Sequence, residues 1–339
     1  MTVSIVFPVY NKSELLPTTL PALLSQTYRD FELIAVDDGS TDGSGDFLDR
    51  LAKTDSRVKV IRQPNAGVSA ARNAALDRAS GDYVVFADAD DTVCPDWLEV
   101  LTKEAEISGA DIVVSGFFST DSNGKALDTV LPPEEGNITG KEFLGNFYAH
   151  QSNHGLPGFG HGKIVRRDLI EKNNIRFTPG LKLAEDLDFF VRLYDKAETV
   201  RTVRYAGYNY LQNAVNSAMF CSAYNVNYLS QIEIWLNIRG ILRKNGAYNE
   251  ENRRFVEERL QNYTLCALLY NNGTPEVNIR HLKELCGTVQ KRKTDMTDAK
   301  ALIPVSFCYR HNLNALCRAY SYLFRLCLKN SSSKVQPAK

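Results

Sequence analysis

Short apolar runs alternate with amphipathic stretches along the first 110 residues of this chain. A short, fully apolar run is typical of a strand buried in a parallel sheet, whereas apolar positions three or four residues apart are typical of a helix. The alternation therefore predicts an α/β fold, with a mostly parallel sheet and helices on both of its faces. The predicted strands lie within 3–11 and at 31–36, 58–61 and 83–86, and the predicted helices lie near 13–27, 42–53 and 68–79.

The pattern changes twice further along the chain. Residues 111–215 have a mixed strand and helix pattern, with a loop rich in glycine and histidine at 150–163. The pattern beyond them is mainly helical, and the Asn-Asn-Gly-Thr-Pro stretch at 271–275 predicts a break between two helices. The predicted helices lie near 222–245, 250–272, 276–291 and 305–328, and residues 331–339 are predicted to be disordered.

Polar residues follow three of the predicted strands. Tyr10 comes after the first strand, Asp38 after the second, and Asp88-Ala89-Asp90-Asp91 after the run at 83–86. Ligands of open α/β sheets bind beyond the carboxyl ends of the strands. We therefore expect a binding site at this rim of the sheet.

The acidic stretch has two explanations. Buried carboxylates without partners are unfavourable, so these either face water in a solvated turn or hold a positive group. Asp88 and Asp90 are one residue apart and can converge on a hard cation, because Mg²⁺ is usually held by one or two carboxylates plus substrate phosphates. Asp91 extends the motif or caps the next segment.

A second polar segment precedes the predicted helix at 68–79. The backbone amides of Asn65-Ala66-Gly67 form a candidate anion site at the start of that helix. Arg72, one turn further on, is a candidate for contacting a phosphate or for pairing with the acidic rim. Asp42 is predicted to cap the helix at 42–53.

These segments, in this order, resemble the family 2 glycosyltransferases of the GT-A fold. The matching segments are 4–11, 31–44, 65–91 and 183–189, and the resemblance extends over residues 1–215. It implies a GT-A-like mostly parallel sheet flanked by helices. The implied domains are 1–215, with a nucleotide-binding half at 1–110 and an acceptor-binding half at 111–215, then a helical region at 216–330 and the tail at 331–339.

The resemblance also implies a site for a UDP-sugar donor and a divalent metal, Mn²⁺ or Mg²⁺. It places Asp38 where a carboxylate accepts the uracil N3–H, and Asp90 where a carboxylate ligates the metal directly. Asp88 would meet the ribose or the metal and its bound water. The remaining donor-binding candidates are Pro8, Val9, Tyr10, Asn65, Gly67, Arg72 and Ala89.

A sugar transfer that inverts the anomeric centre needs a base to deprotonate the acceptor hydroxyl. The resemblance places that base at Asp186, beside Glu185 at the start of a predicted helix. Stabilisation of the helix N-terminus by negative charge is the alternative for either residue. Two weaker candidates lie at the glycine-rich loop. His161 either contacts a metal or phosphate or is a loop histidine without a functional role, and Lys163 is a candidate for contacting a phosphate or the acceptor.

Composition narrows the partners and the compartment. The chain has 40 basic and 40 acidic residues, which argues against nucleic acid as its main partner. Seven cysteines without CxxC spacing suggest reduced thiols in a cytosolic protein. Neither a signal peptide nor an apolar run of about 18 residues is apparent. We therefore expect a cytoplasmic protein, or one on the cytoplasmic face of a membrane.

The segment at 303–329 is aromatic and basic, with apolar residues near one helical face. This pattern fits an interfacial helix at a membrane surface. It equally fits a helix docked on its own domain or on a partner subunit, so a homo-oligomer stays open.

From the resemblance we expect a metal-dependent inverting transfer of a hexose or N-acetylhexosamine from a UDP-sugar. The acceptor would be a hydroxyl of a saccharide or lipid-linked saccharide in a growing surface glycan. A nucleotidyltransferase that forms sugar nucleotides is an alternative, but its glycine-rich basic loop is absent at 8–12. A non-catalytic glycan-binding or scaffold protein of the same fold is a third, and losses at Asp90 or Asp186 would indicate it; both residues are present.

Overall fold

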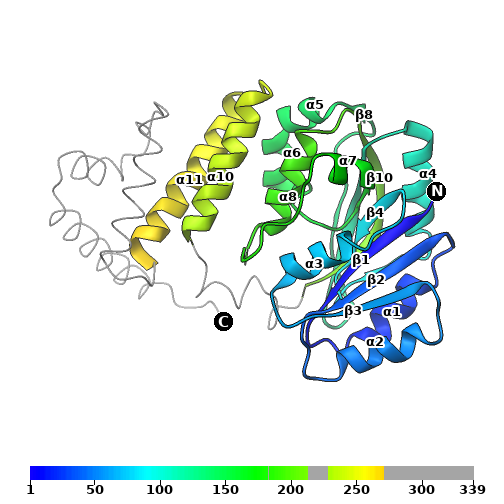
Figure 1. Cartoon of the computed structure of the whole chain (residues 1–339). Coiled ribbons are helices and arrows are strands. Elements are labelled where there is room, and N and C mark those ends of the chain that lie inside the picture. Colours follow the sequence, from blue (N-terminus) through cyan, green and yellow to red (C-terminus); the bar gives the residue numbers. More distant parts are fainter. Residues whose placement is uncertain (182, 213–227, 271–339) are drawn as a thin grey trace. The chain divides into compact units, whose positions relative to one another are not determined.

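A ten-stranded sheet flanked by helices is the main feature of the computed structural model, which describes residues 1–181, 183–212 and 228–270 (Figure 1). The α/β class that the sequence predicts is thereby confirmed. The strands are β1 (Val3–Val9), β2 (Phe31–Asp37), β3 (Val58–Arg62), β4 (Tyr83–Phe86), β5 (Thr92–Val93), β6 (Ile112–Asp121), β7 (Ala126–Val130), β8 (Gly136–Ile138), β9 (Lys163–Arg166) and β10 (Val200–Gln212).

Several connections between these strands contain helices, and further helices follow β10. Those predicted within the first 110 residues are present, although α1 is shorter at both ends than the predicted stretch. The helices are α1 (Leu16–Leu24), α2 (Ser44–Ala52), α3 (Val68–Leu76), α4 (Trp97–Ser108), α5 (Gly140–Gly145), α6 (Phe147–His154), α7 (Arg167–Lys172), α8 (Glu185–Tyr194), α10 (Tyr228–Lys244) and α11 (Glu250–Tyr270).

The sheet has the order β3-β2-β1-β4-β9-β6-β10-β5, with β7 beside β6 and β8 beside β10. The four strands predicted from apolar runs, β1 to β4, pair in parallel. The next strand in the order, β9, runs antiparallel to both β4 and β6. The parallel arrangement therefore holds in the half of the sheet that carries the predicted donor site, and the complete sheet is mixed.

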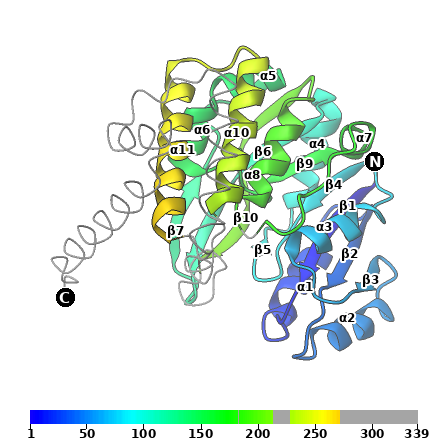
Figure 2. The same ribbon diagram turned by 60° about the vertical axis from the view of Figure 1, so that its left-hand side comes forward.

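Both faces of the sheet are covered at β1, β2 and β4, which explains why these strands are mostly apolar, whereas the edge strand β3 has the exposed residues Lys59 and Arg62. Alternate residues of β1, from Val3 to Val9, belong to one core together with side chains of α1, α2 and α4. On the other face, Phe86 of β4 makes edge-to-face contacts with Phe177, Phe189 and Phe190. Helices α3 and α8 lie on this second face (Figures 1 and 2).

Two local expectations differ from the structure. Helix α6 continues to His154, so the glycine- and histidine-rich loop is shorter than predicted and occupies 155–162. The N-cap of α2 is Gly43, although Asp42 accepts a hydrogen bond from the Ser44 amide at 2.9 Å. Asp42 therefore closes a turn just before the helix.

The chain divides into two compact units, Met1–Val226 with Asn237–Arg253, and Asn227–Leu236 with Arg254–Lys339. In the second unit, the rings of Trp235 and Phe255 pack edge to face at 5.5 Å. The predicted helices at 222–245 and 250–272 correspond to α10 and α11 over the described residues. The break at 271–275, the helices at 276–291 and 305–328, and the tail lie outside them, and the predicted domain boundaries stay predictions.

Helices of the described part of the chain are each too short or too polar to cross a bilayer.

Candidate active site

The carboxyl ends of β1, β2 and β4 meet at one rim of the sheet. The pairing places Val9 beside Asp37 and Val6 beside Phe86, so the residues that follow the three strands emerge together. The backbone amide of Asp38 donates to the carbonyl of Val9 at 2.8 Å. The structure therefore brings the three predicted polar clusters to the same rim.

Asp38 is buried, and donors of the protein itself occupy both of its carboxylate oxygens. Oδ1 accepts from the Gln63 side chain at 2.7 Å and from the Ala66 amide at 2.9 Å, and Oδ2 accepts from the Gly67 amide at 2.8 Å. The anion held by the amides before α3 is therefore the carboxylate of Asp38. Gly67 has φ +88°, a conformation that favours glycine.

The other donor-binding candidates near this loop differ in exposure. Tyr10 is exposed, Val9 is buried and Pro8 is partly buried. Asn65 is exposed, and its backbone passes so close to Gly39 that a Cβ there would lie 2.7 Å from the Asn65 nitrogen. The exposed ring of Tyr10 is free to meet a flat ligand, whereas Val9 could contribute only backbone groups.

Residues 88–91, called the acidic loop below, follow β4 and are anchored by their backbone. The carbonyl of Ala89, itself buried, accepts a hydrogen bond from the Thr19 hydroxyl at 3.2 Å. The side chains of Asp88 and Asp90 are 37% and 38% exposed. They are therefore the parts of the loop that are available to a ligand.

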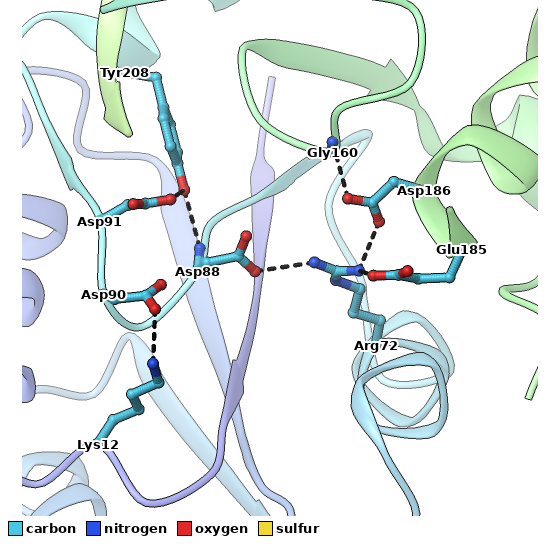
Figure 3. Close-up of polar contacts among 9 residues, drawn as sticks. All are labelled: Lys12, Arg72, Asp88, Asp90, Asp91, Gly160, Glu185, Asp186 and Tyr208. Carbon is cyan, nitrogen blue, oxygen red and sulfur yellow. Dashed lines mark hydrogen bonds and ion pairs between the residues drawn. The ribbon is translucent and has the colours of Figure 1, made fainter. Parts of the chain in front are cut away.

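Arg72 of α3 is buried and binds three carboxylates (Figure 3). Nη2 lies 3.0 Å from Asp88 Oδ1, and Nη1 lies 2.6 Å from Asp186 Oδ1 and 3.2 Å from Glu185 Oε1. Its guanidinium also packs over the ring of Phe177 at 5.2 Å. The alternative that Arg72 pairs with the acidic rim is confirmed, and Arg72 itself is buried, whereas Asp88 is partly exposed.

Asp186 and Glu185 form the first turn of α8. The preceding residue, Ala184, adopts φ +63°, and the turn presents both acidic side chains to Arg72. Asp186 Oδ2 also accepts a hydrogen bond from the Gly160 amide at 3.2 Å. Asp186 is thus held from α3 and from the loop before β9.

The electrostatics follow from this burial. Burial raises the pKa of Asp186 to about 7, although Arg72 acts in the opposite direction and Glu185 and Asp88 add to the increase. Burial also acts against the charge of Arg72, but its three carboxylate partners outweigh it and raise the pKa of the guanidinium. A carboxylate that titrates near neutral pH suits proton transfer at that pH.

Lys163 and His161 lie within the protein rather than at the open rim. Lys163 is 1% exposed, donates from Nζ to the carbonyl of Phe159 and lies over the Phe190 ring at 4.7 Å. Burial lowers the pKa of Lys163 to about 7. His161 is stacked between the rings of Phe159 and Tyr208, at 5.0 and 4.7 Å. In this conformation Lys163 acts on the site through its charge, and the predicted phosphate or acceptor contact stays a prediction.

The residues present fit a divalent cation that is completed by substrate oxygens. In the described part of the chain, no group of three or more His, Cys, Asp or Glu is arranged to hold an ion alone. Asp90 already attracts a cation, because the Lys12 ammonium lies 2.6 Å from its Oδ2. Asp88 and Asp90 could supply one or two ligands, as Mg²⁺ sites with substrate phosphates require.

Three residues that sequence reasoning missed take part in this arrangement: Lys12, Gly160 and Tyr208 (Figure 3). The Tyr208 hydroxyl donates to Asp91 at 2.8 Å and accepts from the Asp88 amide at 3.1 Å. Asp91 therefore binds β10 instead of capping the next segment. Lys12 had a visible signal, since it directly follows the first polar cluster, whereas Tyr208 lies 117 positions from Asp91 and had none.

Known proteins share this fold and this sequence pattern. The family model described as Glycosyl transferase family 2 matches residues 4–173. The uncharacterized glycosyltransferase EpsJ of Bacillus subtilis (strain 168) is 34% identical over 213 residues, 62% of this chain and 61% of its own length. The chain thus spans less than two thirds of EpsJ.

A second relative matches over more of both chains. A cholesterol galactosyltransferase of Borreliella burgdorferi is 32% identical over 271 residues, which cover 77% of this chain and 73% of that protein. Among solved structures, S. aureus TarS 1–349 in complex with UDP-GlcNAc has a TM-score of 0.66 and 21% identity, and the match covers 96% of this chain and 92% of TarS. This likeness confirms the predicted GT-A-like fold.

Proposed function

The chain belongs to glycosyl transferase family 2, and from this premise we propose that it transfers a sugar from a UDP-sugar to a hydroxyl group, with inversion at the anomeric carbon. The sugar is a hexose or an N-acetylhexosamine, and the acceptor is a saccharide or lipid-linked saccharide. One observation carries the proposal: Arg72 joins Asp88 of the acidic loop to Asp186 at the start of α8. The residue proposed to serve the sugar donor, Asp88, and the residue proposed to activate the acceptor hydroxyl, Asp186, both contact the guanidinium of Arg72.

Asp186 is the proposed base. It would take the proton from the acceptor hydroxyl as that oxygen attacks the anomeric carbon, and its raised pKa makes it a better proton acceptor than an exposed carboxylate. Arg72 and the Gly160 amide would orient its carboxylate. Glu185 shares Arg72 and is the alternative base.

Asp90 and Asp88 are the proposed ligands of Mn²⁺ or Mg²⁺. When bound, the metal would neutralise the charge that develops on the diphosphate leaving group. Lys12 would have to leave Asp90, at least in part, because its ammonium occupies one oxygen of that carboxylate. Arg72 would keep its contact with Asp88 and so hold the acidic loop in line with the base.

The UDP part of the proposal rests on two supports. Asp38 lies at the rim of the sheet near the exposed ring of Tyr10, and its carboxylate would have to exchange one of its protein donors for the uracil N3–H. TarS, which has the same fold, is known in complex with UDP-GlcNAc. A location at the cytoplasmic face of a membrane, through 303–329, is part of the same proposal.

A donor screen tests the function. The purified protein is incubated with a panel of UDP-hexoses and UDP-N-acetylhexosamines in Mn²⁺, and UDP release is measured. We expect slow hydrolysis of one donor, lowered by Asp90→Asn. Binding without any release would indicate the non-catalytic alternative. Release of pyrophosphate from UTP and a sugar 1-phosphate would indicate a nucleotidyltransferase.

A further inference from the structure

Tyr208 of β10 is fully buried and directs its hydroxyl at the backbone of the acidic loop (Figure 3). The oxygen lies 2.8 Å from Asp91 Oδ2, to which it donates, and 3.1 Å from the Asp88 nitrogen, from which it accepts. One side chain therefore binds both the first and the last residue of the loop.

The ring of Tyr208 is fixed by its neighbours. His161 stacks on it at 4.7 Å with an interplanar angle of 10°, and Trp97 packs against it edge to face at 5.8 Å. Aromatic contacts of this kind restrict the orientation of the ring. The ring therefore holds the hydroxyl in a fixed position beside the acidic loop, as a group that supports functional residues requires.

A second bond from β10 completes the anchor. Asp91 Oδ1 accepts from the Leu211 amide at 2.8 Å, so both oxygens of Asp91 are bound to β10. Asp88 and Asp90 then point away from this anchor, toward Arg72 and Lys12 respectively. The loop is therefore held on one side by β10, and the carboxylates of Asp88 and Asp90 lie on the other side, where they pair with Arg72 and Lys12.

We propose that Tyr208 is a positioning residue whose hydroxyl fixes the acidic loop, so that Asp88 and Asp90 can serve one divalent cation. The inference rests on the proposed function, because it assumes that these carboxylates meet a metal together with the donor. Groups that support metal ligands in this way typically change metal affinity by about 10–100-fold when removed. A tyrosine that only filled the core would have no such effect.

Tyr208→Phe removes the hydroxyl and keeps the ring stack. Tyr83→Phe is the matched control, because the Tyr83 hydroxyl is also buried and donates to the Ala110 carbonyl at 3.1 Å, at the opposite end of β4 from the acidic loop. UDP is titrated calorimetrically into each full-length protein with Mn²⁺ and with EDTA. The ratio of the two affinities isolates the contribution of the metal, and melting curves report stability.

We expect Tyr208→Phe to lower this ratio by about tenfold, and Tyr83→Phe to leave it unchanged even where both variants melt earlier. An equal ratio in the wild type and Tyr208→Phe overturns the inference. A wild-type ratio of one refutes the metal dependence in the proposed function instead, and the inference with it. An equal ratio above one in the wild type and Tyr208→Phe leaves the proposed function intact, so failure of the inference and failure of the proposed function are distinguishable.

Asp91→Asn decides the matter where Tyr208→Phe does not fold. The amide keeps the size of the side chain and weakens the bonds to Tyr208 and Leu211, so it should also lower the ratio. Where both single variants fold, their effects should not add in the double variant, because the two substitutions break the same connection. An unchanged ratio in Asp91→Asn, or additive effects, contradicts the inference.

Discussion

The guanidinium of Arg72 contacts three carboxylates while its own side chain is only 4% exposed. Removing one partner of a buried ion pair leaves the other charges without compensation, which is far more unfavourable than losing an exposed pair. Because the acidic partners come from the acidic loop and from α8, the charge balance at this residue also determines whether those two segments stay together.

We expect Arg72→Met to lower the free energy of unfolding by about 3 kcal/mol at pH 8, the lower part of the range for buried pairs, because Asp88 is more than a third exposed. The loss should be smaller at pH 6. Burial raises the pKa of Asp186 to about 7, so its carboxyl becomes protonated and loses its charge in the folded protein as pH falls below that value. At pH 6 the variant therefore holds less uncompensated negative charge than at pH 8. Urea denaturation at both pH values measures this.

Arg62→Met is the control for that experiment. Arg62 pairs with Asp46 and Asp49 at the surface, and such pairs contribute about 0–1 kcal/mol. An equal loss for both variants would contradict the role of Arg72.

We expect the pH dependence of turnover to follow the protonation of Asp186, the proposed base. Its carboxyl is faced by Arg72, Glu185, Asp88 and Lys163, and its pKa is about 7. Because a protonated base cannot accept a proton, kcat/KM for transfer should fall by about tenfold per pH unit below pH 7. An acid limb near pH 4 would show that Asp186 is not the base, or that it is ionised more easily than its burial indicates.

Lys163→Met should move that limb to higher pH, since the lysine charge lowers the pKa of Asp186. Lys172→Met offers a matched control, because Lys172 is exposed and pairs with Asp168 away from Asp186. If the acid limb of the kcat/KM profile stays at the same pH in both variants, the charge of Lys163 does not affect the pKa of Asp186.

At the scale of elements, the loop between α6 and β9 contacts the proposed base, Asp186. A Cβ on Gly160 would lie 3.1 Å from Asp186 Oδ2, a contact that requires the carboxylate to shift. The required shift is a few tenths of an ångström. We expect Gly160→Ala to lower kcat by up to about tenfold, because a misplacement of about 1 Å can cost about 100-fold. UDP affinity should change little. Gly136→Ala, where a Cβ meets nothing within 4 Å, should match the wild type in both measurements.

The elements that could be predicted from sequence are those whose burial produces a recognisable pattern of apolar residues within the element itself. The strands β1, β2 and β4 are buried along almost their whole length and have mostly apolar sequences. Asp88, Asp90 and Asp186 stand in segments that resemble a known family. The direction of β9 could not be predicted, since a four-residue strand fits either direction and its partners in β4 lie 79–83 positions away.

The connections within the site were beyond reach for the same reason. Lys12 and Asp90 are 78 positions apart, and Arg72 and Asp186 are 114 apart. Whether Arg72 meets a phosphate or a carboxylate depends on how α8 packs beside α3, and the spacing of residues within either helix does not contain that information.

At the scale of the whole molecule, the basic and aromatic segment at 303–329 can be tested apart from the site. Deletion of 303–339 should release the protein from anionic vesicles and leave UDP binding intact, because each basic residue near such a surface contributes about 1 kcal/mol. Co-sedimentation at low and high salt measures it, since this attraction is screened by salt. Full-length protein that ignores vesicles at low salt, with a truncated form that melts earlier, would indicate docking on the protein instead.

The bonds from Asp91 to Tyr208 and Leu211 also have a consequence for biosynthesis. The two partners are made 117 and 120 residues after Asp91, which at about 5–20 residues per second is a delay on the order of ten seconds. During that interval, the emerging chain already holds β1 to β4 but lacks the strand that secures the acidic loop. A nascent chain therefore gains β1 to β4 well before it gains the anchor of the acidic loop, and a ribosome halted before residue 208 should carry these strands without a finished form of the proposed metal site.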